Sequence, residues 1–266
     1  LATASPAESP LVEPIYEKLK ARKDVRVGML ELKAGPQLIY RTSWLSDTLQ
    51  RTHPDVILIP CDRVEIVPVA MVAYYLGIPV FHLFAGVGST GTYDDLNRRI
   101  ISSFSHLLLA EDDAAKRRLL NSGEEEWRIH IVGSTHGDNM LVDESEVPQG
   151  RYDVILLNPN PANPQDELRT ITWALDLIRP NTPTYWIEPN DPYGHQVLEW
   201  LKKAMPQRRN VIYKPHLPRP KFLGLIANSR RFISNSSSAV YEVPLLGKKI
   251  DVINPGSRNN ARTTES

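Results

Sequence analysis

Short apolar runs alternate with amphipathic segments along the chain. The apolar runs predict strands at 26–33, 55–60, 78–85, 106–110, 128–133, 152–158, 184–189, 210–215, 231–235 and 248–254. The segments between them have helical periodicity, which predicts helices at 11–22, 43–51, 66–76, 94–104, 113–121, 166–178, 193–204, 222–229 and 238–247. Because continuously apolar strands separated by helices are typical of parallel sheets covered on both faces, the pattern predicts an α/β protein.

A polar stretch with proline and glycine interrupts this alternation at residues 141–151. The interruption predicts two doubly wound parallel-sheet domains, residues 1–142 and 143–266. In such domains ligands bind beyond the carboxyl ends of the strands. We therefore expect both domains to face a central cleft that holds the ligand.

Polar side chains follow several predicted strands at their carboxyl ends. They are Asp62 and Arg63 after the strand at 55–60, Asp94 and Asp95 beyond the glycine-rich loop after 78–85, Asn158 after 152–158, Asn190 after 184–189, and Ser236 after 231–235. For each aspartate taken singly, a helix cap or a charge that complements the helix dipole is the simpler interpretation. Their shared position at strand ends favours one common site.

The run NSSS at 235–238 lies between an apolar strand and a predicted helix. Serine and asparagine are preferred helix caps, so capping is one interpretation. The free N–H groups of a helix N-terminus also bind anions, so a phosphate site is the other. This stretch by itself does not decide between them.

Composition narrows the class of protein. Lys+Arg and Asp+Glu number 31 each, which gives no support to a general nucleic-acid or anionic-membrane surface. No apolar run approaches the roughly 20 residues of a membrane-spanning helix, and we do not expect the first residues to be a signal peptide. A single cysteine, Cys61, excludes an intrachain disulfide and fits a cytoplasmic protein. We expect no metal and no cofactor.

Several motifs occur in a fixed order between residues 53 and 262. They read HPDVILIPCDRVE (53–65), YDDLNRR (93–99), LPRPKFLGLIANSRRFISNSSSAVYE (217–242) and NPGSRNNAR (254–262). In this order they resemble the UDP-N-acetylglucosamine 2-epimerases, particularly the hydrolysing branch that forms N-acetylmannosamine for sialic-acid-type sugars. The resemblance implies two Rossmann-like domains in a GT-B-like arrangement, with a UDP-sugar as the partner.

The resemblance also implies roles for individual residues. Ser236 and Ser237 would hold the diphosphate, and Glu242 would bind the ribose hydroxyls. The further substrate contacts that it implies are Arg63, His82, Asn158, Asn190 and Arg258. Asp62 and Asp94 match catalytic carboxylates, and Asp95, which stands where a neighbouring acidic residue is usual, is the third catalytic candidate.

The chain departs from the family pattern at the third catalytic position. Hydrolysing members read H-x-H-G-G-E where this chain reads HLFAGV, so Phe84 replaces a histidine and Val87 a glutamate. The other branch has its glutamate at the position of Phe84. In the second half, Asn158 or Asn160 replaces a histidine that contacts substrate. The segment from 33 to 53 is also short for the family.

Three functions stay open at this point. The first, which we favour, is a 2-epimerase that removes the C2 proton of a UDP-N-acetylhexosamine and eliminates UDP, with or without hydrolysis. The second is a nucleotide-sugar-binding relative without this activity, and the third is a GT-B-type glycosyltransferase. Assembly as a homodimer is a further open alternative.

Overall fold

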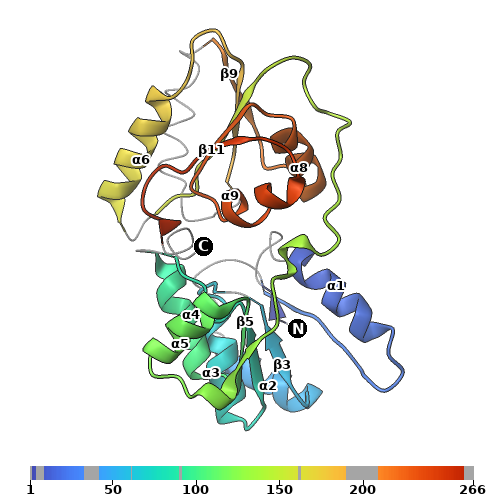
Figure 1. Ribbon diagram of the computed structural model, residues 1–266. Coiled ribbons are helices and arrows are strands. Elements are labelled where there is room, and N and C mark those ends of the chain that lie inside the picture. Colours follow the sequence, from blue (N-terminus) through green and yellow to red (C-terminus); the bar gives the residue numbers. More distant parts are fainter. Residues whose placement is uncertain are drawn as a thin grey trace. The chain divides into compact units, whose positions relative to one another are not determined.

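The computed structural model describes residues 2–3, 9–32, 42–60, 62–89, 92–160, 163–189 and 209–260 (Figure 1). The chain divides into two compact units. Unit 1 comprises Leu1–Gly88 and Tyr93–Asp138, and unit 2 comprises Ser89–Thr92 and Asn139–Ser266. No helix or strand spans residues 139–152, and the domain boundary expected there, between 142 and 143, stays a prediction. None of the helices in the described ranges is long and apolar enough to cross a bilayer.

Unit 1 contains two parallel sheets. Its elements are β1 (Ala2–Thr3), α1 (Ser9–Lys20), β2 (Leu30–Glu31), α2 (Thr42–Thr52), β3 (Ile57–Ile59), α3 (Val67–Tyr75), β4 (Val80–Leu83), α4 (Tyr93–Ser103), β5 (Leu107–Ala110), α5 (Asp113–Asn121), β6 (Ile129–Ile131), and two short 3-10 helices (Glu126–Arg128 and Thr135–Gly137). The main sheet has the order β3-β4-β5-β6, and β1 pairs with β2 and contacts β3.

The strand predicted at 26–33 is wrong in extent. Only Leu30–Glu31 is extended and paired among residues 26–32, because the partner strand β1 is itself two residues long. Strand β1 was missed, since Ala2–Thr3 belongs to no apolar run. The other predicted strands of this half are confirmed within a few residues at each end.

Apolar side chains are buried in two separate clusters in unit 1. One joins β3 and β4 to α2, α3 and α4 through side chains such as Leu45, Ile59 and Ile101. The other joins β5 and β6 to α5 through Leu108, Leu119 and neighbours. Two clusters around one sheet are what the doubly wound pattern predicts.

Unit 2 has a five-stranded parallel sheet. Its elements are β7 (Asp153–Leu156), α6 (Pro164–Asp176), β8 (Thr184–Ile187), β9 (Val211–Lys214), α8 (Arg219–Ala227), β10 (Arg231–Ser234), α9 (Ser238–Tyr241), a 3-10 helix (Val243–Leu246) and β11 (Asp251–Ile253). The order β11-β10-β7-β8-β9 is the Rossmann order, which reverses between β7 and β10. The predicted α/β class with two parallel-sheet domains is confirmed, while the helix predicted at 193–204 lies outside the described residues.

Strand β7 shows why this sheet is covered on both faces. Val154 and Leu156 pack in a cluster with α8, whereas Ile155 and Leu157 pack in a second cluster with α6. Successive side chains of a strand point to opposite faces, so a fully apolar strand requires a helix on each side.

The single helix predicted at 238–247 is wrong. Helix α9 ends at Tyr241, and a separate 3-10 helix follows from Val243. Pro244 explains the break, because proline has no N–H to donate and disfavours the α conformation in the residue before it. Glu242 therefore sits at the junction between the two short helices.

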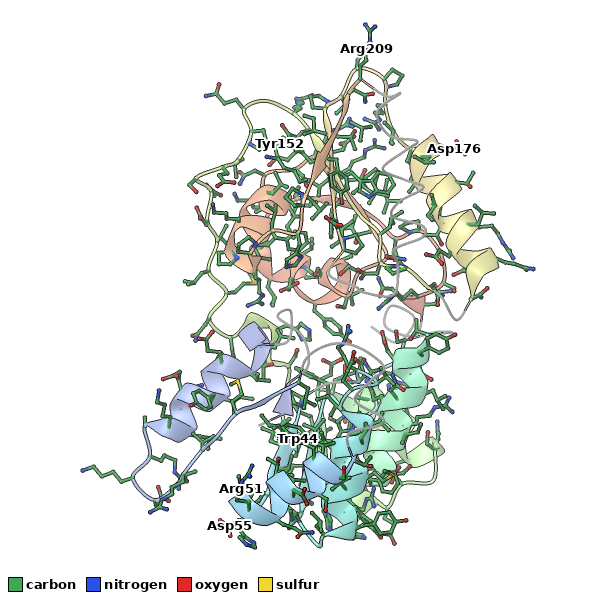
Figure 2. All side chains as sticks on the ribbon, turned by 180° about the vertical axis from the view of Figure 1, so that it is seen from behind. Trp44, Arg51, Asp55, Tyr152, Asp176 and Arg209 are labelled. Atoms are coloured by element: carbon green, nitrogen blue, oxygen red, sulfur yellow. The ribbon has the colours of Figure 1, made fainter. Side chains whose placement is uncertain are left out.

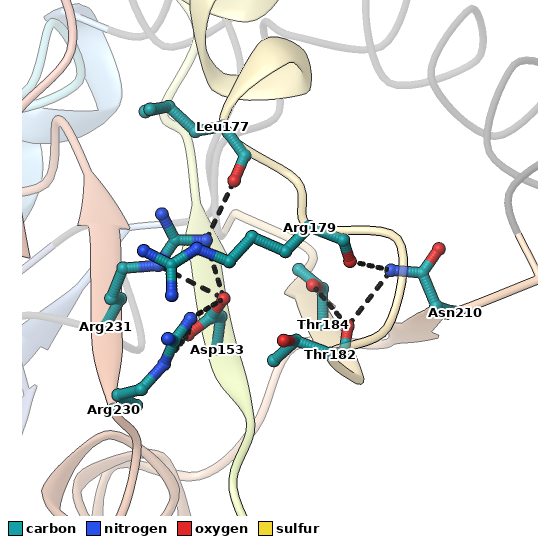
Figure 3. A network of polar contacts seen from close by, with 8 residues as sticks. All are labelled: Asp153, Leu177, Arg179, Thr182, Thr184, Asn210, Arg230 and Arg231. Carbon is teal, nitrogen blue, oxygen red and sulfur yellow. Dashed lines mark hydrogen bonds and ion pairs between the residues drawn. The ribbon is translucent and has the colours of Figure 1, made fainter.

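The amino ends of β7 and β10 are joined by an ion-pair network (Figure 3). Asp153 is fully buried and accepts hydrogen bonds from the guanidinium groups of Arg230 and Arg231, with N–O distances of 2.7–3.2 Å. Arg231 also donates to the carbonyl of Leu177 at 2.8 Å.

Figure 2 displays the described side chains of both units, with Tyr152 labelled; this residue directly precedes β7. Burial raises the pKa of the Tyr152 phenol, whose hydroxyl donates to the carbonyl of Leu225.

Candidate functional site

The point where the strand order of unit 2 reverses brings the ends of β7 and β10 together. The amide of Asn235 accepts from the N–H of Asn158 at 2.7 Å and donates to its carbonyl at 2.9 Å. Ser234 donates to the carbonyl of Leu156 at 2.6 Å. These bonds fix the two loops that follow the strands, at the place where doubly wound sheets bind ligands.

Arg258 and Asn259 form hydrogen bonds with the loop after β7 and with the serine run, respectively. A guanidinium N–H of Arg258 donates to the carbonyl of Pro159 at 3.0 Å, and the amide of Asn259 donates to the carbonyl of Ser236 at 3.0 Å. Arg258, predicted as a nucleotide contact, thus lies beside the loop after β7. The segment after β11, the loop after β7 and the serine run therefore form one cluster.

The serine run has one weak capping bond, made by Ser236 and not by Ser237. The Oγ of Ser236 accepts from the N–H of Ser238 at 3.3 Å, which is a long helix-capping bond. Ser237 precedes the first residue of α9 and its side chain makes no capping bond. Capping thus accounts for Ser236 only in part, and phosphate binding by Ser236 and Ser237 stays a prediction.

Glu242 is buried, with 7% of its surface exposed. Its Oε1 accepts a hydrogen bond of 2.6 Å from the Nε of Arg219, the first residue of α8. Sequence reasoning missed Arg219 as part of the site, although it lies in the LPR motif. No periodicity connects residues 219 and 242, so only the fold reveals the pair.

The structure distinguishes Asn158 from Asn160. Asn158 contributes its main chain to the bonds with Asn235. Asn160 is 3% exposed, and within the part of the chain that the structure describes neither polar atom of its side-chain amide has a hydrogen-bond partner. A buried amide without partners is costly in a folded protein, which makes Asn160 a candidate for a ligand contact. The substrate contact of Asn158 stays a prediction. Asn190 lies outside the described residues.

In unit 1, Arg98 joins two predicted features. One of its guanidinium N–H groups forms a short ion pair with the carboxylate of Asp62, and another donates to the carbonyl of Val87 at 2.6 Å. Arg98 is 6% exposed, and it was missed although it lies in the quoted motif YDDLNRR. The predicted catalytic Asp62 and the loop that contains Val87 are therefore neighbours.

That loop is held in a strained conformation. Phe84 has a φ of 60°, which is uncommon for a bulky side chain, and its buried ring lies 5.2 Å from the ring of His136 between centroids. Gly86 follows with a φ of 77°, and a Cβ there would lie 2.3 Å from the carbonyl oxygen of Ala115. Arg118 donates to the carbonyl of Gly86 at 2.6 Å. Strain of this kind is common at functional sites.

Asp94 and Asp95 open helix α4, where negative charge complements the helix dipole. Asp94 lies four residues before Arg98 and Asp95 lies three residues before it, and both spacings make neighbours on a helix surface. The carboxylate of Asp95 lies 3.5 Å from the guanidinium of Arg99, whose side chain is well exposed. Because Asp95 is paired with this exposed arginine, we expect Asp94 rather than Asp95 to act with Asp62, and the roles of both stay predictions.

The remaining predicted contacts of unit 1 are more enclosed. His82 is fully buried in β4, and its Nδ1 lies 2.9 Å from the Oγ of Ser102 in α4. The Nε of Arg63 lies 3.4 Å from the carboxylate of Glu65, which is also buried. The contact of His82 and Arg63 with substrate stays a prediction. The convergence of both units on one cleft also stays a prediction.

Within the described ranges, no group of three or more His, Cys, Asp or Glu side chains could hold a metal ion.

Comparison with known proteins identifies the family of the chain. A family model described as UDP-N-acetylglucosamine 2-epimerase matches residues 37–266. The UDP-N,N'-diacetylbacillosamine 2-epimerase (hydrolyzing) of Legionella pneumophila is 32% identical over 230 residues, which are 82% of this chain and 60% of that protein. The GDP/UDP-N,N'-diacetylbacillosamine 2-epimerase (hydrolyzing) of Campylobacter jejuni is 31% identical over 237 residues, 83% of this chain and 61% of that protein.

The fold is shared with a solved structure. The UDP-GlcNAc 2-epimerase of Neisseria meningitidis, bound to UDP-GlcNAc, superposes with a TM-score of 0.79 at 17% identity, covering 98% of this chain and 84% of that one. This likeness confirms the GT-B-like fold class. The chain spans about 60% of the length of the two curated relatives. On the match of the family model to residues 37–266, the chain belongs to the UDP-N-acetylglucosamine 2-epimerase family.

Proposed function

We propose that the protein is a hydrolysing 2-epimerase that acts on a UDP-N-acetylhexosamine. The cluster at the reversal point of unit 2 carries the proposal, because it gathers hydroxyls, a guanidinium, an unpaired amide and a buried carboxylate at the end of a Rossmann sheet. The family match and the functions of the two relatives named above support the same activity.

In this proposal unit 2 binds the nucleotide. Ser236 and Ser237 hold the diphosphate with hydroxyl and backbone N–H groups, and Arg258 adds a positive charge beside them. Glu242 accepts hydrogen bonds from the two ribose hydroxyls. Asn190 is a further proposed nucleotide contact, and Asn160 takes the position of the family histidine that contacts substrate.

The carboxylates of unit 1 perform the proton transfers. One carboxylate takes the proton from C2 of the sugar, the electrons of that bond form a C1–C2 double bond, and the C1–O bond breaks as UDP leaves. Water then adds its hydroxyl to C1, and a proton returns to C2 from the opposite face. Asp62 and Asp94 are the proposed acid–base pair, because Asp62 forms an ion pair with Arg98 and Asp94 lies four residues before Arg98 in α4.

The two buried apolar side chains in the loop after β4 favour a second candidate. Phe84 and Val87 stand where the family has acid–base groups, and both are less than a tenth exposed. A nucleotide-sugar-binding relative, or a glycosyltransferase that needs no C2 chemistry, would tolerate them. We place the epimerase first, because Asp62 is retained and is held by Arg98.

The proposed activity also suggests a substrate, a biosynthetic role, a location in the cell and an assembly. The substrate is UDP-N-acetylglucosamine or a related UDP-sugar such as UDP-N,N'-diacetylbacillosamine. A hydrolysing enzyme of this kind would supply free 2-epimeric sugars for the synthesis of sialic-acid-type sugars. We propose a cytoplasmic enzyme, with a homodimer as its assembly.

The decisive experiment follows the C2 proton. The protein is incubated in D₂O with UDP-N-acetylglucosamine and with UDP-N,N'-diacetylbacillosamine, and the products are analysed by NMR. We expect deuterium at C2 and release of UDP with at least one substrate. Asp62→Asn and Asp94→Asn should each lower the rate by about 10²- to 10⁴-fold, because each removes one acid–base group. Asp95→Asn is the matched control and should have a much smaller effect.

Binding of UDP, measured in parallel, separates the candidates. Intact UDP binding without any C2 exchange would overturn the epimerase proposal and favour the binding protein or the glycosyltransferase. Absence of UDP binding at millimolar nucleotide would overturn the nucleotide-sugar assignment altogether.

A further inference from the structure

The contact between Arg219 and Glu242 links two elements that are distant in the sequence. The Nε of Arg219, at the start of α8, donates to Oε1 of Glu242 at 2.6 Å, and the two side chains are 14% and 9% exposed. We propose that Arg219 is a positioning residue, which orients the Glu242 carboxylate towards the ribose of a bound uridine nucleotide. This inference rests on the proposed function and adds a residue to it.

The backbones on both sides of this contact are fixed by proline. Arg219 lies between Pro218, which caps α8, and Pro220 in its first turn. Glu242 lies at the junction that Pro244 creates. Because the main chain cannot adjust easily at either place, the remaining freedom lies in the long side chain of Glu242, and a charge-assisted hydrogen bond restricts it to one orientation.

The contact leaves binding capacity on the carboxylate. A carboxylate has about four lone-pair sites on its two oxygens, and Arg219 occupies one site on Oε1. Oε2 and the second site of Oε1 can still accept the two vicinal hydroxyls of a ribose. Arginine fits this role better than lysine, because its planar guanidinium donates from a fixed direction.

Helix α8 does not depend on this pair for its packing. Phe222, Leu223 and Ile226 of the same helix are buried in the core of unit 2. Lys221, two residues after Arg219, forms an exposed ion pair with Glu146. Lys221→Gln therefore removes a cationic partner from the same turn of helix without touching Glu242, and it serves as the matched control.

The experiment compares UDP with 2′-deoxy-UDP by calorimetric titration. We expect the wild-type protein to bind UDP about tenfold or more tightly than 2′-deoxy-UDP, since one charge-assisted hydrogen bond is lost. Glu242→Gln should bring the ratio close to one. Arg219→Gln and Arg219→Lys should each lower the ratio several-fold, while Lys221→Gln should keep the wild-type ratio. A purely structural role for Arg219 would weaken both ligands equally and leave the ratio unchanged.

The outcomes separate this inference from the proposed function. If the Arg219 variants keep the wild-type ratio while Glu242→Gln loses it, Arg219 is not a positioning residue and the proposed function stands. If the wild-type protein binds UDP without preferring the ribose, the role of Glu242 is overturned and the inference with it. If the wild-type protein does not bind UDP, the proposed function itself is overturned. Thermal unfolding identifies folded variants, and Arg219→Lys replaces Arg219→Gln if the latter does not fold.

Discussion

The buried polar side chains at the two ends of strands β7 and β10 differ in their hydrogen bonding. At the amino end, the carboxylate of buried Asp153 accepts hydrogen bonds from both Arg230 and Arg231 (Figure 3). Arg231 also donates to the carbonyl of Leu177. At the carboxyl end, the side chain of Asn160 is also buried but has no hydrogen-bond partner among the described residues. The same two strands therefore have a hydrogen-bonded buried carboxylate at one end and a buried amide without such a partner at the other.

This difference indicates a division of tasks. A buried polar group without a partner costs about 1–3 kcal/mol, so it persists where something other than stability maintains it. We infer that the amino end holds the strands together and that the carboxyl end keeps polar groups available for the proposed ligand. Variants at the two ends should consequently differ in what they change.

The largest expected effect on stability is at the amino end. Asp153→Asn leaves two arginines beside a neutral amide, and removing one partner of a buried ion pair costs about 3–5 kcal/mol. We expect the free energy of unfolding, measured by urea denaturation, to fall by this amount. UDP affinity of the folded protein should stay close to wild type. A large loss of affinity at unchanged stability would contradict the division of tasks.

At the carboxyl end, Glu242→Gln should mainly affect binding. Hydrogen bonds to a charged group contribute about 1.5–3 kcal/mol, so UDP affinity should fall roughly 10- to 150-fold in calorimetric titration. The loss of unfolding free energy should be smaller than that of Asp153→Asn. If Glu242→Gln and Asp153→Asn lower the unfolding free energy equally, both ends of the strands serve stability and the division of tasks is wrong.

The smallest and most specific effect concerns Asn160. Asn160→Leu removes a buried unsatisfied amide at similar volume, so the unfolding free energy should stay the same or rise by about 1 kcal/mol. UDP or UDP-sugar binding should nevertheless weaken. Asn158→Ala is the control, because the bonds between Asn158 and Asn235 use the main chain of Asn158. If only Asn158→Ala weakens binding, then Asn158 and not Asn160 contacts the substrate.

Local patterns were sufficient for most of the secondary structure. Helix α5 begins and ends as predicted, since Asp112 caps it by accepting from the N–H of Ala115 at 2.7 Å. The alternation of Val154, Ile155, Leu156 and Leu157 between two faces follows from the period of a strand. Where a local signal was overlooked, as with Pro244 in the segment 238–247, the prediction failed.

The candidate site was predicted less completely. The strand-end positions indicated Asp62 and Ser236 as candidates, and the family resemblance added Glu242; their roles stay predictions. Neither signal identified Arg98 and Arg219 as the partners of Asp62 and Glu242. Each ion pair spans more than twenty residues, and a partner at that separation depends on how whole elements pack.

The sequence by itself thus determined the two parallel-sheet halves, the family and the residue types at the strand ends, because periodicity and motif order are local properties of the chain. Only the tertiary structure decided which arginine pairs with which carboxylate, that the buried amide of Asn160 has no partner among the described residues, and that Asn158 is bonded through its main chain. Burial and hydrogen bonding depend on distances between segments that are remote in sequence, and no local pattern encodes those distances.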